Sequence, residues 1–164
     1  AQGLSTFVPV QGRSRAMSLA LDGRNITLVD DSYNANPDSV RAAIDVLADL
    51  PGPRLLVLGD MGEVGSEGPA FHTEAGAYAA AKGIEHVLFS GQLSRYALAA
   101  SPGSQHFDDM AALRQAAVAL LSKVASVLVK GSRFMRMEQV VEAITQACAT
   151  PEKEKTHQGE ATCC

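Results

Sequence analysis

Leu28-Val29-Asp30-Asp31-Ser32-Tyr33-Asn34-Ala35-Asn36-Pro37-Asp38-Ser39 is the stretch of sequence that decides the fold. It begins as the apolar end of a strand, passes through small polar side chains and opens a helix at Pro37 or Ser39, with Ser39 or Asp38 as the expected cap. Open α/β sheets place ligand chemistry where a strand turns sharply into a helix. Residues 59–63 and 130–133 are also polar and also follow apolar strands. In a parallel sheet these three segments would meet at one edge, which is therefore the predicted site.

On the N-terminal side of this stretch, Asp22-Gly23 separates two short apolar runs, residues 15–21 and 24–29. An Asp-Gly pair in this position is a strong hairpin signal, because a type I′ turn needs positive φ at both central residues. We therefore expect an antiparallel edge strand beside a more buried second strand.

On the C-terminal side, short apolar runs alternate with helical periodicity. The runs at 54–58, 86–89 and 126–129 read as strands, with a minor strand at 105–107. Helical patterns fall at residues 40–50, 69–82, 93–100, 110–122 and 135–147. The alternation predicts an α/β three-layer sandwich: a mostly parallel sheet with helices on both faces and an antiparallel edge hairpin at the N-terminus.

Length and composition fit one domain. The 164 residues are 46% hydrophobic and 20% charged, which suffices to bury a single core. We expect the domain to span residues 1–150, because polar residues dominate 151–164 and predict a flexible tail there. The net charge of −4 without a Lys/Arg cluster argues against nucleic acid as a partner. No apolar run approaches the roughly 20 residues needed for membrane insertion.

The sequence does not support a disulfide framework, a Gly-rich phosphate-binding loop or a histidine metal site. The cysteines, Cys148, Cys163 and Cys164, form no CxxC pair, so we expect reduced thiols in a cytoplasmic protein. Neither Gly-rich phosphate-binding pattern is present, so a bound nucleotide would have its triphosphate held mainly elsewhere. His72 has no second His or Cys at ligand spacing and is expected to be a polar contact between elements.

Each acid and each amide of the central stretch has two possible roles. Asp30 and Asp31 could accept from ribose hydroxyls or hold a hydrated Mg²⁺, or they could be a helix cap and a solvated acid. Asn34 and Asn36 could bind an uncharged substrate or the region of a γ-phosphate, or they could form Asx turns.

The two later segments add charge. Asp60 could bind an incoming ammonium group, or belong to an exposed acidic loop. Lys130 and Arg133 follow a late strand, and Arg can hold a carboxylate through two parallel hydrogen bonds. Alternatively, both cations could lie at a helix terminus or be solvated at the surface.

Residues 31–39, 58–65 and 129–133 together resemble three motifs of the C-terminal domain of the Mur ligases, in the same register. Within that family they are most similar to the member that joins D-alanyl-D-alanine to UDP-N-acetylmuramoyl-tripeptide, with Val64 where Leu is usual. The resemblance implies a Rossmann-like fold and an ATP-dependent amide ligase of peptidoglycan synthesis, acting through an acyl phosphate.

The resemblance also implies partners. A complete enzyme would have an N-terminal domain for the UDP-sugar and a central ATPase domain, and this chain would be the third domain, inactive alone. ATP and Mg²⁺ would be bound mainly by the central domain. D-alanyl-D-alanine would be the ligand of the third domain.

Residue roles follow from the matched positions. The nucleotide side would include Arg13, Asp31, Tyr33 and Asn34. Tyr33 stands where a sister ligase has a lysine near the γ-phosphate, and a phenol cannot supply that charge. The acceptor side would include Asn36, Asp60, Lys130 and Arg133. The resemblance assigns no catalytic residue and no metal ligand to this domain.

Two other functions remain open at this point. One is a stand-alone Rossmann-like binding module without catalysis. The other is the folylpolyglutamate synthetase class, which shares this domain type but typically carries a His in the strand-to-helix motif, where this chain has Asn34-Ala35-Asn36.

Overall fold

The computed structural model describes residue 12 and residues 14–149. The expected tail at 151–164 and Arg13 lie outside the described residues. Six strands form one sheet in the order β1-β2-β6-β3-β4-β5, and every neighbouring pair except β1–β2 is parallel. The strands are β1 (Arg15–Leu21), β2 (Arg24–Asp31), β3 (Arg54–Gly59), β4 (His86–Ser90), β5 (Gln105–Phe107) and β6 (Ser126–Lys130).

The predicted hairpin is confirmed. Asp22 and Gly23 have φ of 50° and 75°, as a type I′ turn requires, and the register pairs Leu21 with Arg24 and Arg15 with Asp30. β2 runs two residues beyond its apolar stretch and ends at Asp31. The hairpin thereby brings the first polar segment to the sheet edge beside β6.

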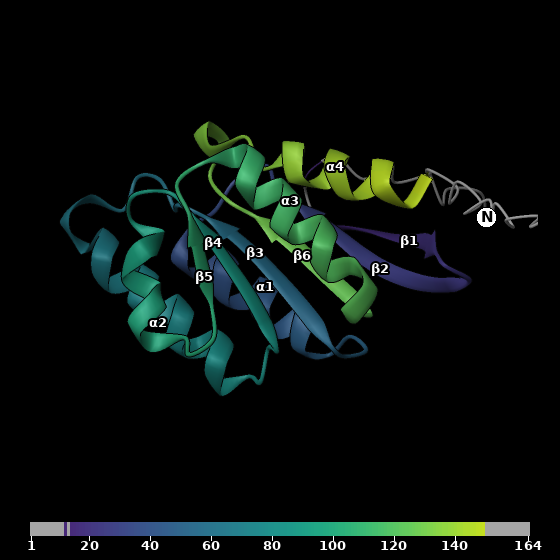
Figure 1. Cartoon of the computed structure of the whole chain (residues 1–164). Helices are drawn as coiled ribbons and strands as arrows, with labels where there is room; N and C mark the ends of the chain where they lie inside the picture. The colour runs from purple at the N-terminus through teal and green to yellow at the C-terminus, as the bar shows by residue number, and fades with distance from the viewer. Residues whose placement is uncertain (1–11, 13, 150–164) are drawn as a thin grey trace, which may run out of the picture.

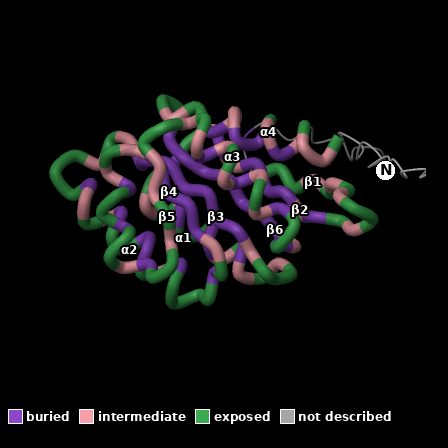
Figure 2. Tube along the Cα trace, in the orientation of Figure 1, coloured by how far each residue is buried: buried purple, intermediate pink, exposed green. Residues whose placement is uncertain are grey.

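Helices cover both faces of the sheet, as the alternating pattern predicts. α3 (Met110–Leu120) and α4 (Glu138–Ala149) lie in front of the sheet in Figure 1, whereas α1 (Pro37–Ala48) and α2 (Gly68–Ala81) lie behind it. Each layer has its own apolar core, so the central strands are buried along most of their length (Figure 2). This is the mostly parallel three-layer sandwich that the sequence predicts.

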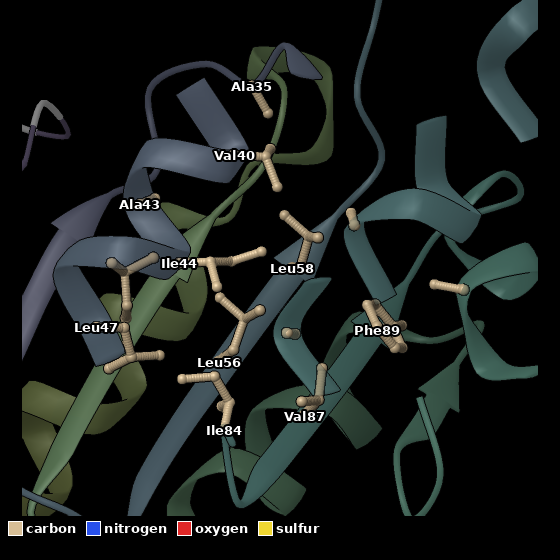
Figure 3. Packing of buried hydrophobic residues seen from close by; sticks show 14 of the residues in the cluster. Ala35, Val40, Ala43, Ile44, Leu47, Leu56, Leu58, Ile84, Val87 and Phe89 are labelled. Carbon is tan, nitrogen blue, oxygen red and sulfur yellow. The ribbon is translucent and has the colours of Figure 1, made fainter. Parts of the chain in front are cut away.

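α1 shows why the sequence folds in this way. Its apolar residues Val40, Ala43, Ile44 and Leu47 recur at helical spacing and are all buried. In Figure 3, Ile44 and Leu47 point from α1 toward the β3 side chains that form the same core. Burial of each large aliphatic side chain contributes about 1.5–3 kcal/mol, so this face fixes α1 on the sheet.

The expected cap of α1 is wrong. Asn36, rather than Ser39 or Asp38, is the N-cap: its side chain accepts from the Ser39 N–H at 2.8 Å, and the Ser39 hydroxyl accepts from the Asn36 N–H at 3.0 Å. This reciprocal capping box starts the helix at Pro37, whose missing N–H costs nothing at the first helical position.

Three other helical segments differ from the sequence prediction. Residues 94–100 form the 3₁₀ helix η2 (Ser94–Ala100), and α3 ends at Leu120 before the short helix η3 (Leu121–Lys123). α4 begins at Glu138, not at Met135. The reason is that η4 (Arg133–Met135) is followed by Arg136, whose φ of 53° is left-handed and interrupts a continuous helix.

Candidate functional site

The three polar segments meet at one edge of the sheet. β6 lies between β2 and β3, with Asp31 opposite Lys130 and Lys130 opposite Leu58. The loops after β2 and β3 turn toward α1 and α2, whereas the loop after β6 turns toward α4 on the other face. Such a divergence opens a crevice at the carboxyl ends of the strands, where ligands bind in open α/β sheets.

A groove of about 640 Å³ occupies this crevice. Residues 33–37, 62–64 and 132–134 line it, which means that all three predicted segments contribute. Phe134 leaves 65% of its surface exposed there. The guanidinium of Arg133 and the amides of Asn34 and Asn36 supply polar groups, so the groove suits a small ligand with an anionic group, hydrogen-bonding groups and apolar side chains.

Asp31 and Lys130 form an ion pair beside the groove. Lys130 Nζ lies 2.6 Å from Asp31 Oδ2, and the side chains are 3% and 14% exposed. Asp31 Oδ1 also accepts from the N–H and the hydroxyl of Ser14, at 3.0 and 3.1 Å. Lys130 Nζ makes a second bond, to the Asn34 carbonyl at 2.9 Å. Lys130 is thus a buried internal contact rather than an exposed cation.

Asp30 has a structural role. It is buried, and its carboxylate accepts from the N–H of Gly12 at 3.1 Å and from the N–H and hydroxyl of Ser32 at 3.2 and 2.6 Å. These bonds hold the end of β2 against the segment that precedes β1. Of the two acids that the sequence offers for a nucleotide, Asp31 is the more accessible one.

Asp60 does not line the groove. It is buried, and its Oδ1 accepts from the N–H of Leu93 at 3.1 Å and from the N–H of Ser94 at 2.7 Å. The approach is close: a Cβ added to Gly91 would lie 2.3 Å from Asp60 Oδ1. Asp60 therefore supports the start of η2, and a role in binding an ammonium group stays a prediction.

Tyr33 and Arg133 form one wall of the groove. Arg133 Cζ lies 5.1 Å from the centre of the Tyr33 ring, and Nη1 lies 3.3 Å from the phenol oxygen. The same two residues line a second hollow of about 470 Å³, together with Gly12 and Arg136. The pair thus divides the crevice into two compartments.

The amides of Asn34 and Asn36 differ in their surroundings. The Asn36 oxygen is used by the helix cap. The Asn34 side chain is exposed and makes no hydrogen bond with the described part of the chain. Of the predicted pair, Asn34 has its whole amide available to a ligand, whereas Asn36 has only its NH₂.

Sequence reasoning missed Ser132. It is 2% exposed, its hydroxyl lies between the loops after β2 and β3, and its N–H donates to the Asp60 carbonyl at 2.9 Å. The available signal was its place two residues after Lys130, because alternate residues of an extended segment share a face.

Within residues 12 and 14–149, no three His, Cys, Asp or Glu side chains come together as a metal-binding group. None of the helices in that range is long and apolar enough to cross a bilayer.

Residues 13–133 match the family model described as "Mur ligase, glutamate ligase domain". The UDP-N-acetylmuramoyl-tripeptide–D-alanyl-D-alanine ligase of Escherichia coli is 44% identical over 146 residues, which cover 88% of this chain and 32% of the ligase. The ligase of the same name from Bacillus subtilis is 33% identical over 132 residues, covering 74% and 28%. The chain thus spans about a third of the length of these curated relatives.

Solved structures of MurF also match this chain, again over about a third of their length. MurF from Acinetobacter baumannii superposes with a TM-score of 0.77 at 30% identity, covering 87% of this chain and 32% of that one. MurF ligase from Thermotoga maritima in complex with ADP gives a TM-score of 0.76 at 26% identity, covering 89% and 33%.

Proposed function

The chain belongs to the Mur ligase family, and from this premise we propose that it is the C-terminal domain of a ligase that joins D-alanyl-D-alanine to UDP-N-acetylmuramoyl-tripeptide. The relatives at 44% and 33% identity carry that name, and each is between three and four times as long as the part of it that aligns with this chain. We place the domain at residues 1–150 and the tail at 151–164. The N-terminal and central domains of the same enzyme would be its partners.

The observation that carries the proposal is the composition of the groove. D-alanyl-D-alanine is a small ligand with a carboxylate, an amine, a peptide bond and two methyl groups. Arg133 offers a cation for the carboxylate, and Asn34 offers an amide for the peptide bond. Phe134, Pro37 and Val64 offer apolar surface for the methyl groups. Asn36 would contribute through the NH₂ of its amide, which the helix cap leaves unused.

Asp31 fits the nucleotide side. A carboxylate accepts about four hydrogen bonds, and Asp31 receives three, two from Ser14 and one from Lys130. One acceptor position remains, which suits a single ribose hydroxyl better than a metal ion. Arg13 and Tyr33 would complete this side, with Tyr33 contributing its ring and phenol rather than a charge.

ATP and Mg²⁺ would be held mainly by the central domain. The chain has no Gly-rich phosphate loop, and its described residues offer no cluster of three metal-ligating side chains. ATP would supply the phosphoryl group that activates the tripeptide carboxylate as an acyl phosphate. This domain would bind the dipeptide and orient its amine for attack on that carbonyl, with loss of phosphate. Because ATP and the nucleotide-linked precursor are cytoplasmic metabolites, we place the reaction in the cytoplasm.

Phosphate release by the full-length protein tests the proposal. We expect release that requires ATP, Mg²⁺, the tripeptide precursor and D-alanyl-D-alanine together, and no turnover by residues 1–164 alone. Full-length protein that releases no phosphate with all four present would favour a binding module without catalysis. Product formed from a folate and glutamate, in place of the tripeptide precursor and the dipeptide, would favour the folylpolyglutamate synthetase class.

A further inference from the structure

Ser132 links the two walls of the groove through one hydroxyl. Its Oγ donates to the Ala35 carbonyl at 3.2 Å and accepts a short hydrogen bond from the Gly62 N–H. Ala35 belongs to the loop after β2, and Gly62 to the loop after β3. The hydroxyl therefore bridges these two loops and sets the distance between them at this point.

Lys130 holds the neighbouring carbonyl of the same wall. Lys130 and Ser132 are two residues apart in extended backbone and face the α1 side together, as Leu128 of the α1 core does. Their bonds reach consecutive carbonyls, Asn34 from Lys130 and Ala35 from Ser132. The two side chains thus fix the main chain of the segment that carries Asn34.

The consequence concerns the Asn34 side chain. With its carbonyl turned toward β6, its amide is left exposed at the groove. The Gly62 bond to Ser132 places the opposite wall in turn. This wall is closely packed, since an added Cβ at Gly62 would lie 3.0 Å from the Phe134 ring and 3.1 Å from Ser132 Oγ. The segment that carries Asn34 and the Gly62 wall are therefore positioned by the same small group of hydrogen bonds.

From this geometry we infer that Ser132 and Lys130 are positioning residues for the acceptor dipeptide. They would set the segment that presents Asn34 without touching the dipeptide themselves. This inference rests on the proposed function and changes the expected role of Lys130, from a ligand of the dipeptide to a support of the groove wall. A misplacement of reacting groups by about 1 Å can reduce rate by about 100-fold, so such supports matter for the second chemical step.

Replacement of Ser132 in the full-length ligase tests the inference, with Ser126→Ala as the matched control. Ser126 begins β6, the strand that leads to Ser132, and it is fully buried. Its hydroxyl donates to a backbone carbonyl, that of Pro51 at 2.7 Å, but at the opposite end of the strand. We expect Ser132→Ala to lower kcat/KM for D-alanyl-D-alanine by about 10- to 100-fold. ADP formation from ATP and tripeptide before dipeptide is added should change less than about threefold in both variants.

Amide hydrogen exchange gives a second readout. Ser132→Ala should speed exchange in the peptide that contains Gly62, whose N–H loses its acceptor, and Ser126→Ala should leave that peptide unchanged. Equal losses of dipeptide kcat/KM in the two variants, or a Ser132→Ala effect on ADP formation as large as that on the dipeptide, would overturn the inference. A wild-type ligase that is inactive with all substrates would instead refute the proposed function.

Discussion

The imidazole of His72 accepts a hydrogen bond from the backbone N–H of Met61, with 2.9 Å between Nε2 and the nitrogen. Nδ1 lies 2.6 Å from the Gly68 carbonyl, so Nδ1 carries the proton and the ring is neutral. The side chain is fully buried. His72 thus joins the first turn of α2 to the loop after β3, which forms one wall of the groove, as a polar contact between elements.

Replacement of His72 should destabilise the domain. His72→Ala removes the acceptor of a buried N–H and leaves a cavity, so we expect the free energy of unfolding to fall by about 2–5 kcal/mol. Urea denaturation measures this change. Thr73→Ala, at the exposed neighbouring position, should change stability by only about 0.5 kcal/mol. Similar midpoints for the two variants would contradict the role given to His72.

The ion pair of Asp31 and Lys130 leads to a second prediction. Lys130→Met leaves a largely buried carboxylate without its cation, which typically costs about 3–5 kcal/mol. Asp31→Asn combined with Lys130→Met should recover part of this loss, because no unpaired charge then remains. A double-mutant cycle by chemical denaturation gives the coupling. Simple additivity of the two changes would show that the pair does not act as a unit.

The pH dependence of stability should include a contribution from Asp45 and Lys82 on the outer surface of α1 and α2. The hydrogen bond from Lys82, at 2.6 Å, and that from Tyr78 hold the pKa of Asp45 below its ordinary value. A lowered carboxyl pKa stabilises the folded state above the unfolded pKa, and this stabilisation is lost as the pH falls through the folded pKa. The pKa of Lys82 is raised by the same hydrogen bond with Asp45, so its contribution is lost at alkaline pH.

Asp45→Asn should therefore lower Tm at neutral pH by a small amount, because both groups are solvated. The difference from wild type should shrink as the pH falls from about 4, near the unfolded pKa, through the lower folded pKa, because Asp45 is then protonated in both states. Lys82→Met should reduce the same acid dependence. A Tm difference that stays constant from pH 7 to pH 2.5 would rule out this contribution.

Cys148 should react slowly with alkylating agents. Burial raises the pKa of its thiol, which reduces the thiolate fraction at neutral pH. Peptide-resolved mass spectrometry after iodoacetamide treatment should show Cys148 labelled several-fold more slowly in folded protein than in urea. Equal rates in the two conditions would show that the thiol is accessible.

Local signals in the sequence account for most of the fold. The turn at Asp22-Gly23 follows from the φ values that these two residues tolerate, and Gly83 ends α2 with a φ of 71°. The break before α4 was missed because it depends on the left-handed conformation of Arg136. The sequence has no Gly, Asn or Asp there, the residues that usually adopt that conformation. The cap at Asn36 was missed because Ser39 is an equally good local candidate, and the reciprocal bonds between them decide the boundary.

The site was harder to predict than the fold, because its residues act through distant partners. Topology alone brings residues 31–36 beside 130–133, and the sequence predicts this correctly. It does not show that Lys130 is buried against Asp31, about a hundred positions away in the chain, or that Ser132 touches both loops. Such roles depend on contacts between side chains and backbone that are remote in sequence.

Asp60 is the residue for which the contact in the fold and the family-based expectation differ most. Its Oδ1 accepts from two backbone N–H groups at the start of η2, and Gly91 leaves room for this approach. His72 Nε2 lies 3.9 Å from the same oxygen, and the ring is neutral there. The carboxylate is therefore engaged inside the domain. The sequence instead suggested an incoming ammonium group as its ligand, and the family resemblance implied a place on the acceptor side.

Two variants separate these roles of Asp60. Asp60→Ala leaves the part-buried N–H of Leu93 and the buried N–H of Ser94 without an acceptor, so we expect the free energy of unfolding to fall by about 2–4 kcal/mol. Asp60→Asn keeps one acceptor oxygen and should recover part of this loss, while KM for D-alanyl-D-alanine in the full-length ligase stays within about threefold of wild type. If Asp60 instead bound the ammonium group, Asp60→Asn would raise that KM by tenfold or more through loss of charge, since hydrogen bonds to charged groups contribute about 1.5–3 kcal/mol. Urea denaturation and dipeptide kinetics on the same two proteins decide between a support of η2 and a ligand of the substrate.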